Sequence, residues 1–162
     1  MQPLITPENF YSLPQLPFNI HLGMEFERSA PGEGATLRLP ASPTTLNGDG
    51  TIHRSAMYTL GEVAAAVSVL DNLVEALPVF LLTLGGEFNP VQPAHGAVWT
   101  RAHVKEEPDE AVASLREKRK RQFTGHVSIF DEHDKLVAEM NATFLARVLS
   151  ATMTATLAAQ TG

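Results

Sequence analysis

The hydrophobic positions of this chain follow two different spacings, which predict one long helix among several strands. From Ala56 to Leu77, apolar residues recur at alternating intervals of four and three positions, the spacing of one face of an α-helix. Pro78 is expected to end this helix. The residues on its other faces are mostly small or apolar, so we expect a sheet to wrap around its first turns and cover them on most sides.

Two short segments before this helix have the alternation typical of strands. Residues 23–28 and 35–39 alternate charged with apolar side chains around the turn-forming sequence Pro31 to Gly34, a pattern typical of a β-hairpin. Residues 41–50 are expected to form a loop that ends in the turn Asn47-Gly-Asp-Gly50.

Four segments after the helix are rich in strand-forming residues. They are Val79 to Phe88, Ala97 to Val104, Phe123 to Phe130 and Lys135 to Arg147, with turns expected at Asn89-Pro90, at Pro93 and from Asp131 to Asp134. Between them, the charged residues 106–120 predict a solvent-exposed helix. Two strands, one buried helix and four further strands make an α+β layout, whose free sheet edges are commonly closed by dimerisation.

Length and charge narrow the class of protein. The 162 residues, 44% of them hydrophobic, suit one compact domain, which we assign to residues 21–149. Residues 1–20, with four prolines, are expected to form an N-terminal arm, and residues 150–162 a C-terminal tail. The net charge of −6 argues against a nucleic-acid partner. Because neither a signal peptide nor a membrane span is recognisable, we expect a cytoplasmic protein that does not enter membranes.

The sequence offers little material for metal or thiol chemistry. It has no cysteine, which excludes disulfides and a catalytic thiol. None of its six histidines follows another at the spacings of two or four residues typical of metal ligands, so no metal site is expected.

Glu62 is the only charged side chain between Ser55 and Leu70. Burying an unpaired charge is costly, so Glu62 should find hydrogen-bond donors, have a raised pKa, or face a cleft. Ser55, Thr59, Ala66 and Val69 lie at helical spacing from it and form a stripe of small side chains that could floor a narrow pocket. The alternative is a structural carboxylate that is capped by a hydroxyl or N–H, or that points to solvent.

The residues just before the helix are a second candidate site. The first backbone N–H groups of a helix, here after His53 and Arg54, have no intrahelical acceptor and can bind an oxyanion. The alternative is equally physical, because Asn-Gly and Asp-Gly are ordinary turn pairs and every helix has such a start.

Taken together, Asn47-x-x-Gly50-x-x-His53 and Glu62, nine residues after the histidine, resemble the signature of hotdog-fold acyl-CoA thioesterases. The similar families include phenylacetate-pathway and 4-hydroxybenzoyl-CoA thioesterases. In those families two glycines follow the histidine, and here Arg54 and Ser55 replace them. Pro93-Ala-His-Gly96 looks like the family's Pro-x-x-Gly turn. The resemblance covers about residues 20–147 and implies an antiparallel sheet wrapped around one long central helix.

This resemblance implies hydrolysis of an acyl-CoA, or of a related thioester on an acyl carrier, without a separate cofactor, since coenzyme A is part of the substrate. The N–H of Arg54 would stabilise the oxyanion, Glu62 would attack directly or activate water, and Asn47 would orient water or the acyl carbonyl. His53 completes the candidate catalytic set. The family's sites lie between two subunits, so a dimer or tetramer is expected.

The candidate substrate-binding residues are Gly50, Ser55, Tyr58, Thr59, Arg119 and Arg121. The last two belong to the run Arg116 to Arg121, which holds five of the twelve basic residues and could bind the phosphates of coenzyme A. The alternative for this run is a solvated helix end, where cations suit the negative end of the helix dipole.

Three other functions stay open. A non-catalytic module that binds or senses acyl-CoA on the same fold is favoured by the missing glycine pair and by Ala66, where some relatives carry Ser or Thr. A structural dimer without a ligand is another class. An enoyl-CoA hydratase is a minor alternative, because Glu87-Phe-Asn-Pro-Val-Gln92 resembles the hydratase motif, yet Gln92 cannot take a proton and the motif follows the long helix.

Overall fold

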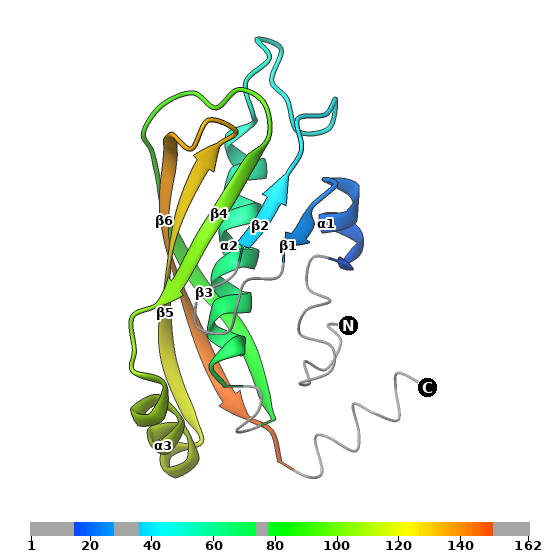
Figure 1. Ribbon diagram of the computed structural model, residues 1–162. Helices are drawn as coiled ribbons and strands as arrows, with labels where there is room; N and C mark the ends of the chain where they lie inside the picture. The colour runs from blue at the N-terminus through cyan, green and yellow to red at the C-terminus, as the bar shows by residue number, and fades with distance from the viewer. Residues whose placement is uncertain (1–14, 28–35, 74–77, 151–162) are drawn as a thin grey trace.

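A six-stranded antiparallel sheet and one long helix make up most of the structure, a computed structural model that describes residues 15–27, 36–73 and 78–150 (Figure 1). The strands are β1 (Glu25–Glu27), β2 (Thr36–Leu39), β3 (Val79–Pro90), β4 (Val98–Val104), β5 (Lys120–Asp131) and β6 (Leu136–Val148), in the spatial order β1-β2-β4-β5-β6-β3. Helix α2 (Arg54–Asp71) packs on one face of this sheet, α1 (Pro17–His21) precedes β1, and α3 (Pro108–Lys118) joins β4 to β5. The predicted α+β class, with an antiparallel sheet packed around one long helix, is confirmed.

The strands match the sequence pattern, with one correction. Pairing of β1 with β2 confirms the hairpin, although its expected turn, and residues 1–14 and 151–162 of the expected arm and tail, lie outside the described residues. The turn predicted at Asn89-Pro90 is wrong, because both residues continue β3 and pair with β6. Proline is tolerated there because β3 is an edge strand, where an N–H on the outer side needs no partner.

The predicted end of the long helix is also wrong. Helix α2 ends at Asp71 because Asn72 caps it: the Asn72 N–H donates to the carbonyl of Leu70, and its side-chain amide donates to the carbonyl of Ser68 at 2.8 Å. Leu73 follows the helix end and is still fully buried. Val74 and Leu77, the last positions of the predicted helix face, lie outside the described residues.

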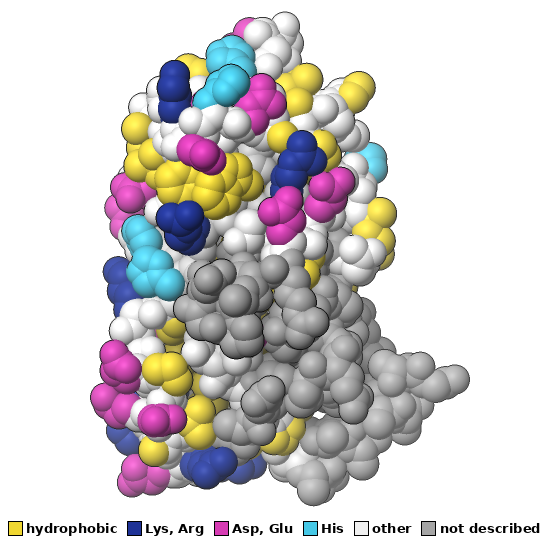
Figure 2. Space-filling model, viewed as in Figure 1, with side chains coloured by type: hydrophobic (Ala, Val, Ile, Leu, Met, Phe, Trp, Pro, Cys, Tyr) yellow, Lys and Arg dark blue, Asp and Glu magenta, His cyan; other side chains and the backbone are white. Residues whose placement is uncertain are grey.

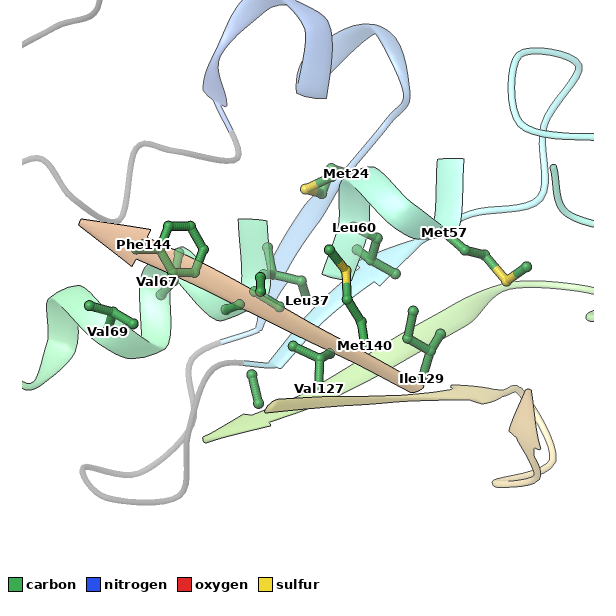
Figure 3. Close-up of a cluster of buried hydrophobic side chains, with 14 of the residues drawn as sticks. Met24, Leu37, Met57, Leu60, Val67, Val69, Val127, Ile129, Met140 and Phe144 are labelled. Atoms are coloured by element: carbon green, nitrogen blue, oxygen red, sulfur yellow. The ribbon is translucent and has the colours of Figure 1, made fainter. Parts of the chain in front are cut away.

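The hydrophobic core fills the space between α2 and the inner face of the sheet (Figure 3). Its fully buried members include Leu37, Leu60, Val67, Ile129, Met140 and Phe144. Burial of each large aliphatic or aromatic side chain contributes roughly 1.5–3 kcal/mol. The apolar residues that recur with helical period along α2 and those that alternate along β5 and β6 are therefore buried in the same core.

Glycines let α2 approach the sheet closely. A Cβ atom on Gly125 of β5 would lie 2.7 Å from the Cβ of Ala65 and 3.1 Å from its Cα. Further along, a Cβ on Gly61 would lie 2.8 Å from the Sδ of Met140 on β6. These contacts set the height of α2 above the sheet and hence the position of every side chain that the helix carries.

The outer face of the sheet is partly solvated and carries a separate aromatic group. Trp99 stacks on Phe130 with ring centroids 4.7 Å apart, and the Arg101 guanidinium lies 5.5 Å from the Trp99 centroid. Figure 2 shows a hydrophobic patch with basic and histidine side chains beside it on the face presented there. Within the described segments, no helix combines the length and apolar character needed to cross a membrane.

Replacing Gly125 by alanine is expected to destabilise the fold by about 1–3 kcal/mol, because the new methyl group would press on the Cβ and Cα atoms of Ala65, which cannot turn aside as the end of a long side chain can. The measurement is the free energy of unfolding in urea. Gly48→Ala is the matched control, since nothing lies within 4 Å of a Cβ at that position. Equal stability of the two variants would contradict the close helix contact.

The turn from β5 to β6 gives a second stability prediction. The Oδ1 atom of Asp131 accepts hydrogen bonds from the backbone N–H groups of His133 at 2.8 Å and Lys135 at 3.0 Å. These bonds, the one from Lys135 above all, hold the pKa of Asp131 below its usual value. The ionised carboxylate therefore stabilises the fold above the unfolded-state pKa of about 3.9, and this contribution is lost as the pH falls through the folded-state pKa.

Asp131→Asn should accordingly be less stable than wild type near neutral pH, with a difference that narrows as the pH falls below about 4. Urea unfolding of both proteins at several pH values measures this difference. A difference that stays constant down to the lowest pH would show that the charge of Asp131 has no part in it.

Candidate active site

The loop before α2 is held together by its own hydrogen bonds. The Asn47 N–H donates to the carbonyl of Thr51 at 2.8 Å, and its side-chain amide donates to the Thr51 hydroxyl at 2.9 Å. Gly50 takes the left-handed φ of +82° that glycine adopts without strain, and its N–H donates to the Asn47 carbonyl at 3.0 Å. The Asn47 amide nitrogen is thus used inside the loop, while its side-chain oxygen has no partner among the described residues.

The acid of this loop has a structural role. The Asp49 carboxylate accepts from the Thr51 hydroxyl at 2.6 Å and from the Thr51 N–H at 3.0 Å. These bonds, the hydroxyl's first, hold the pKa of Asp49 below its usual value. Asp49 therefore stays ionised within its own turn.

His53 caps the start of α2. Its Nδ1 accepts from the Ser55 N–H at 3.1 Å, and its carbonyl accepts from the N–H groups of Ala56 at 3.0 Å and Met57 at 3.2 Å. The His53 N–H donates to the backbone carbonyl of Thr45 at 2.7 Å, and this bond connects the helix cap to the loop. Of the N–H groups in the first helical turn, that of Arg54 has no acceptor within the described segments. It is the donor to which the family resemblance assigns the oxyanion.

Thr45 is a residue of this site that the sequence did not single out. Its side chain is fully buried, and its hydroxyl donates to the Pro40 carbonyl at 2.8 Å and accepts from the Ser42 N–H at 2.9 Å. It holds the loop that places His53. The only hint in the sequence is the segment Ser42-Pro-Thr-Thr45, whose residue types are ordinary for a loop.

Glu62 lies on α2 about two turns after Arg54 and is half-buried. The donors expected for its carboxylate are absent from the described residues, which give it neither an ion pair nor a hydrogen bond. Its neighbour Gly61 lies against Met140, so Glu62 follows the point at which α2 contacts β6. The carboxylate is therefore open to solvent beside a tightly packed stretch of the helix.

The other residues predicted around Glu62 divide into two kinds. The hydroxyl of Thr59 donates to the carbonyl of Ser55 at 3.0 Å, so it is turned back onto the helix. The ring of Tyr58 packs against Phe88 of β3 with centroids 6.1 Å apart. Tyr58 thus connects the face of α2 that carries Glu62 with strand β3.

Strand β3 is an open edge of the sheet. Residues 82–87 are all exposed, including Leu82 at 46% and Leu84 at 47% of their full accessible surface. An exposed apolar edge strand has unpaired backbone N–H and C=O groups, to which a strand of another chain can bind. The face of α2 with Tyr58 and the edge of β3 therefore border the same open side of the molecule.

Arg119 and Arg121 are not brought together with these groups. Arg119 ends α3 with a left-handed φ of 61° and its guanidinium donates to the carbonyl of Leu149, whereas Arg121 donates to the carbonyl of Glu110 and lies 3.9 Å from its carboxylate. Helix α3 lies beside the C-terminal end of α2, at the far end from Arg54. The two helices line a cavity of about 530 Å³ to which Asp71 contributes. Among the described residues, no three His, Asp or Glu side chains lie close enough together to hold a metal ion.

No protein-family model matches the chain, and no curated protein does either. Solved structures are similar over most of its length. A Pseudomonas aeruginosa protein of unknown function, named a probable thioesterase, is 20% identical with a TM-score of 0.74, and the match covers 92% of this chain and all of that one.

Two further structures agree. A thioesterase family protein from Silicibacter pomeroyi is 18% identical with a TM-score of 0.70, over 88% of this chain and 98% of that one. A Haemophilus influenzae thioesterase is 20% identical with a TM-score of 0.68, over 91% of this chain and 94% of that one. The sheet order, the central helix and these likenesses together show that the chain has the hotdog fold found in structures of the thioesterase superfamily.

Proposed function

We propose that this protein hydrolyses an acyl thioester, carried by coenzyme A or by an acyl carrier, at a site shared by two copies of the chain. The observation that carries this proposal is the start of α2, where the Arg54 N–H alone in the first turn lacks an acceptor among the described residues, while Glu62 on the same helix is open and unpaired. The names of the structures with the same fold support the class of reaction.

Each group has a chemical task in this reaction. Glu62 takes a proton from water, whose oxygen attacks the thioester carbonyl carbon; direct attack by the carboxylate is the alternative route. The Arg54 N–H, at the positive end of the helix dipole, stabilises the negative charge that develops on the carbonyl oxygen. The carbon–sulfur bond then breaks, and the thiol leaves with the proton that Glu62 had taken. Neither Arg119 nor Arg121 is required for these steps.

The two groups of one chain cannot serve the same thioester. Arg54 and Glu62 are eight residues apart, which along an α-helix is about 12 Å. The N–H that polarises a thioester carbonyl lies about 3 Å from its oxygen, and the attacking water oxygen lies about 3 Å from its carbon. The N–H and the carboxylate that activates this water must therefore be much closer to each other than about 12 Å. The Glu62 of one copy would therefore act with the Arg54 N–H of another.

The open edge of β3 supports such a pairing. If two β3 strands paired antiparallel about a two-fold axis, the sheets would continue into one another and the exposed leucines Leu82 and Leu84 would be covered. The two α2 helices would then run past each other in opposite directions, so that the start of one meets the middle of the other.

Glu62→Gln is expected to lower turnover of acyl-CoA by about 100- to 10,000-fold with the fold retained, because the amide cannot take a proton. The measurement is free-thiol release from short, long and aromatic acyl-CoAs. Glu117→Gln, the same change on the exposed face of α3, is the matched control and should release thiol at the wild-type rate. Undiminished release by Glu62→Gln would exclude the proposed mechanism, and acyl-CoA binding without release by wild type would favour a binding module.

Arg54→Pro is expected to lower kcat by about 100- to 1,000-fold, since it removes the proposed oxyanion donor together with the arginine side chain. Proline suits the first position of a helix, and His53 has the extended backbone (ψ 132°) that a residue before proline prefers, so α2 should still form. Arg54→Ala keeps the N–H and is the control that should keep kcat. Equal loss in the two variants would assign the effect to the side chain instead.

Mixing the two inactive variants tests whether the site is shared. A dimer of one Glu62→Gln chain and one Arg54→Pro chain contains one site with both groups intact. Random exchange of subunits should therefore restore about a quarter of the wild-type turnover. A mixture that stays as inactive as its components would place both groups in one chain.

A further inference from the structure

The loop before α2 forms a short hairpin that leads directly into the helix start. Two backbone hydrogen bonds join its arms: the His53 N–H donates to the Thr45 carbonyl at 2.7 Å, and the Asn47 N–H donates to the Thr51 carbonyl at 2.8 Å. Two residues of chain span at most about 7 Å. Asn47 and Thr51 are therefore held close to the helix cap, at the end of α2 that presents the Arg54 N–H.

The side chain of Thr51 connects two other side chains of this hairpin. Its hydroxyl oxygen lies 2.6 Å from Oδ1 of Asp49 and 2.9 Å from Nδ2 of Asn47. A hydroxyl has one proton to donate and lone pairs with which it accepts. The Asp49 carboxylate, which the hydroxyl and the N–H of Thr51 keep ionised, can only accept. The proton of the Thr51 hydroxyl is therefore donated to Asp49.

This direction decides which way the Asn47 amide faces. Because the Thr51 hydroxyl donates to Asp49, it can only accept from Asn47, and the amide must turn its NH₂ group toward it. The Asn47 side-chain oxygen then faces away from Thr51 and has no partner among the described residues. The backbone of Asn47 is fixed as well, since its carbonyl accepts from the Gly50 N–H at 3.0 Å. Asn47 thus offers the site an acceptor and not a donor.

An acceptor at this place suits water and does not suit the acyl carbonyl. The carbonyl oxygen of a thioester has no proton to donate, so the Asn47 oxygen would repel it. The hydrolytic water has two O–H groups, and Glu62 takes the proton of one. The other needs an acceptor that keeps the water oxygen directed at the carbonyl carbon, because a misplacement of about 1 Å costs roughly 100-fold in rate.

We infer that Thr51 is a positioning residue that makes Asn47 the acceptor for the second O–H of the hydrolytic water. The inference rests on the proposed function and selects between the two tasks that the family resemblance leaves open for Asn47, orienting water or the acyl carbonyl. One chain then supplies the oxyanion donor at Arg54 and the water acceptor at Asn47, and a second copy supplies the base Glu62. The second proton stays on the oxygen and leaves with the acid product.

Two variants at position 47 separate these tasks. Asn47→Ala removes the acceptor and should lower kcat for thiol release from acyl-CoA about 100-fold, with KM little changed. The double variant Asn47→Asp/Asp49→Asn keeps the total charge and gives position 47 two acceptor oxygens, one for the Thr51 hydroxyl and one for water. Its kcat should lie within about tenfold of wild type. A kcat at or below that of Asn47→Ala overturns the inference, since an acceptor at position 47 would then bring no gain.

Variants of Thr51 test the positioning without changing Asn47. Thr51→Val removes the hydroxyl and lets the amide turn, so kcat per folded protein should fall about tenfold, the size of one hydrogen bond, with KM little changed. Thr51→Ser returns the hydroxyl and should restore most of kcat. Thr44→Val is the matched control, because the Thr44 hydroxyl lies 2.8 Å from that of Ser42 in the same loop and should leave kcat and KM unchanged.

A purely structural Thr51 would lower the melting temperature of Thr51→Val and leave kcat per folded protein as in wild type; that result, or equal losses in Thr51→Val and Thr51→Ser, overturns the role of Thr51. Glu62→Gln measured alongside distinguishes this failure from that of the proposed function. Full turnover by Glu62→Gln overturns both, whereas loss of turnover there without recovery in Asn47→Asp/Asp49→Asn overturns only the task assigned to Asn47 and Thr51.

Discussion

The close contact between α2 and the sheet at Gly125 and Ala65 is the constraint on which the rest of the structure depends. At this point the bare backbone of a strand meets a helix with only the methyl group of Ala65 between them, which leaves no room for a further methyl group. The same closeness recurs where Gly61 meets Met140. Because α2 is held this firmly, each of its side chains has a fixed position relative to the sheet.

What this packing covers and what it leaves open together define the candidate site. The sheet curves around the apolar face of α2, but the strand order ends at β3, and beyond that edge no described strand or helix covers the face with Tyr58 and Glu62. The helix start is open for a different reason, because His53 caps the following N–H groups and the N–H of Arg54 has no acceptor in the described part of the chain. A half-buried acid and a spare backbone donor thus lie on one rigid helix, where a ligand or a partner can reach both.

Much of the fold could be predicted because the relevant forces act between residues that are near in the chain. Helical periodicity located α2, and β-rich segments located β3 to β6. The errors have equally local causes. Asn72 ended the helix before Pro78 by capping it with its own amide, and Pro90 extended a strand because that strand has a free edge, a property that only the strand order determines.

The sequence by itself determined the elements, the apolar core face of α2, the loop around Asn47 and the single acid Glu62 among small and apolar residues, because spacing and local hydrogen bonding are written in consecutive positions. Only the tertiary structure decided which strand lies at the edge, that Tyr58 rests on Gly86, and that Arg119 and Arg121 lie far from Arg54. These are relations between residues distant in the chain, set by how a twisted sheet closes on a helix, and no local pattern encodes them.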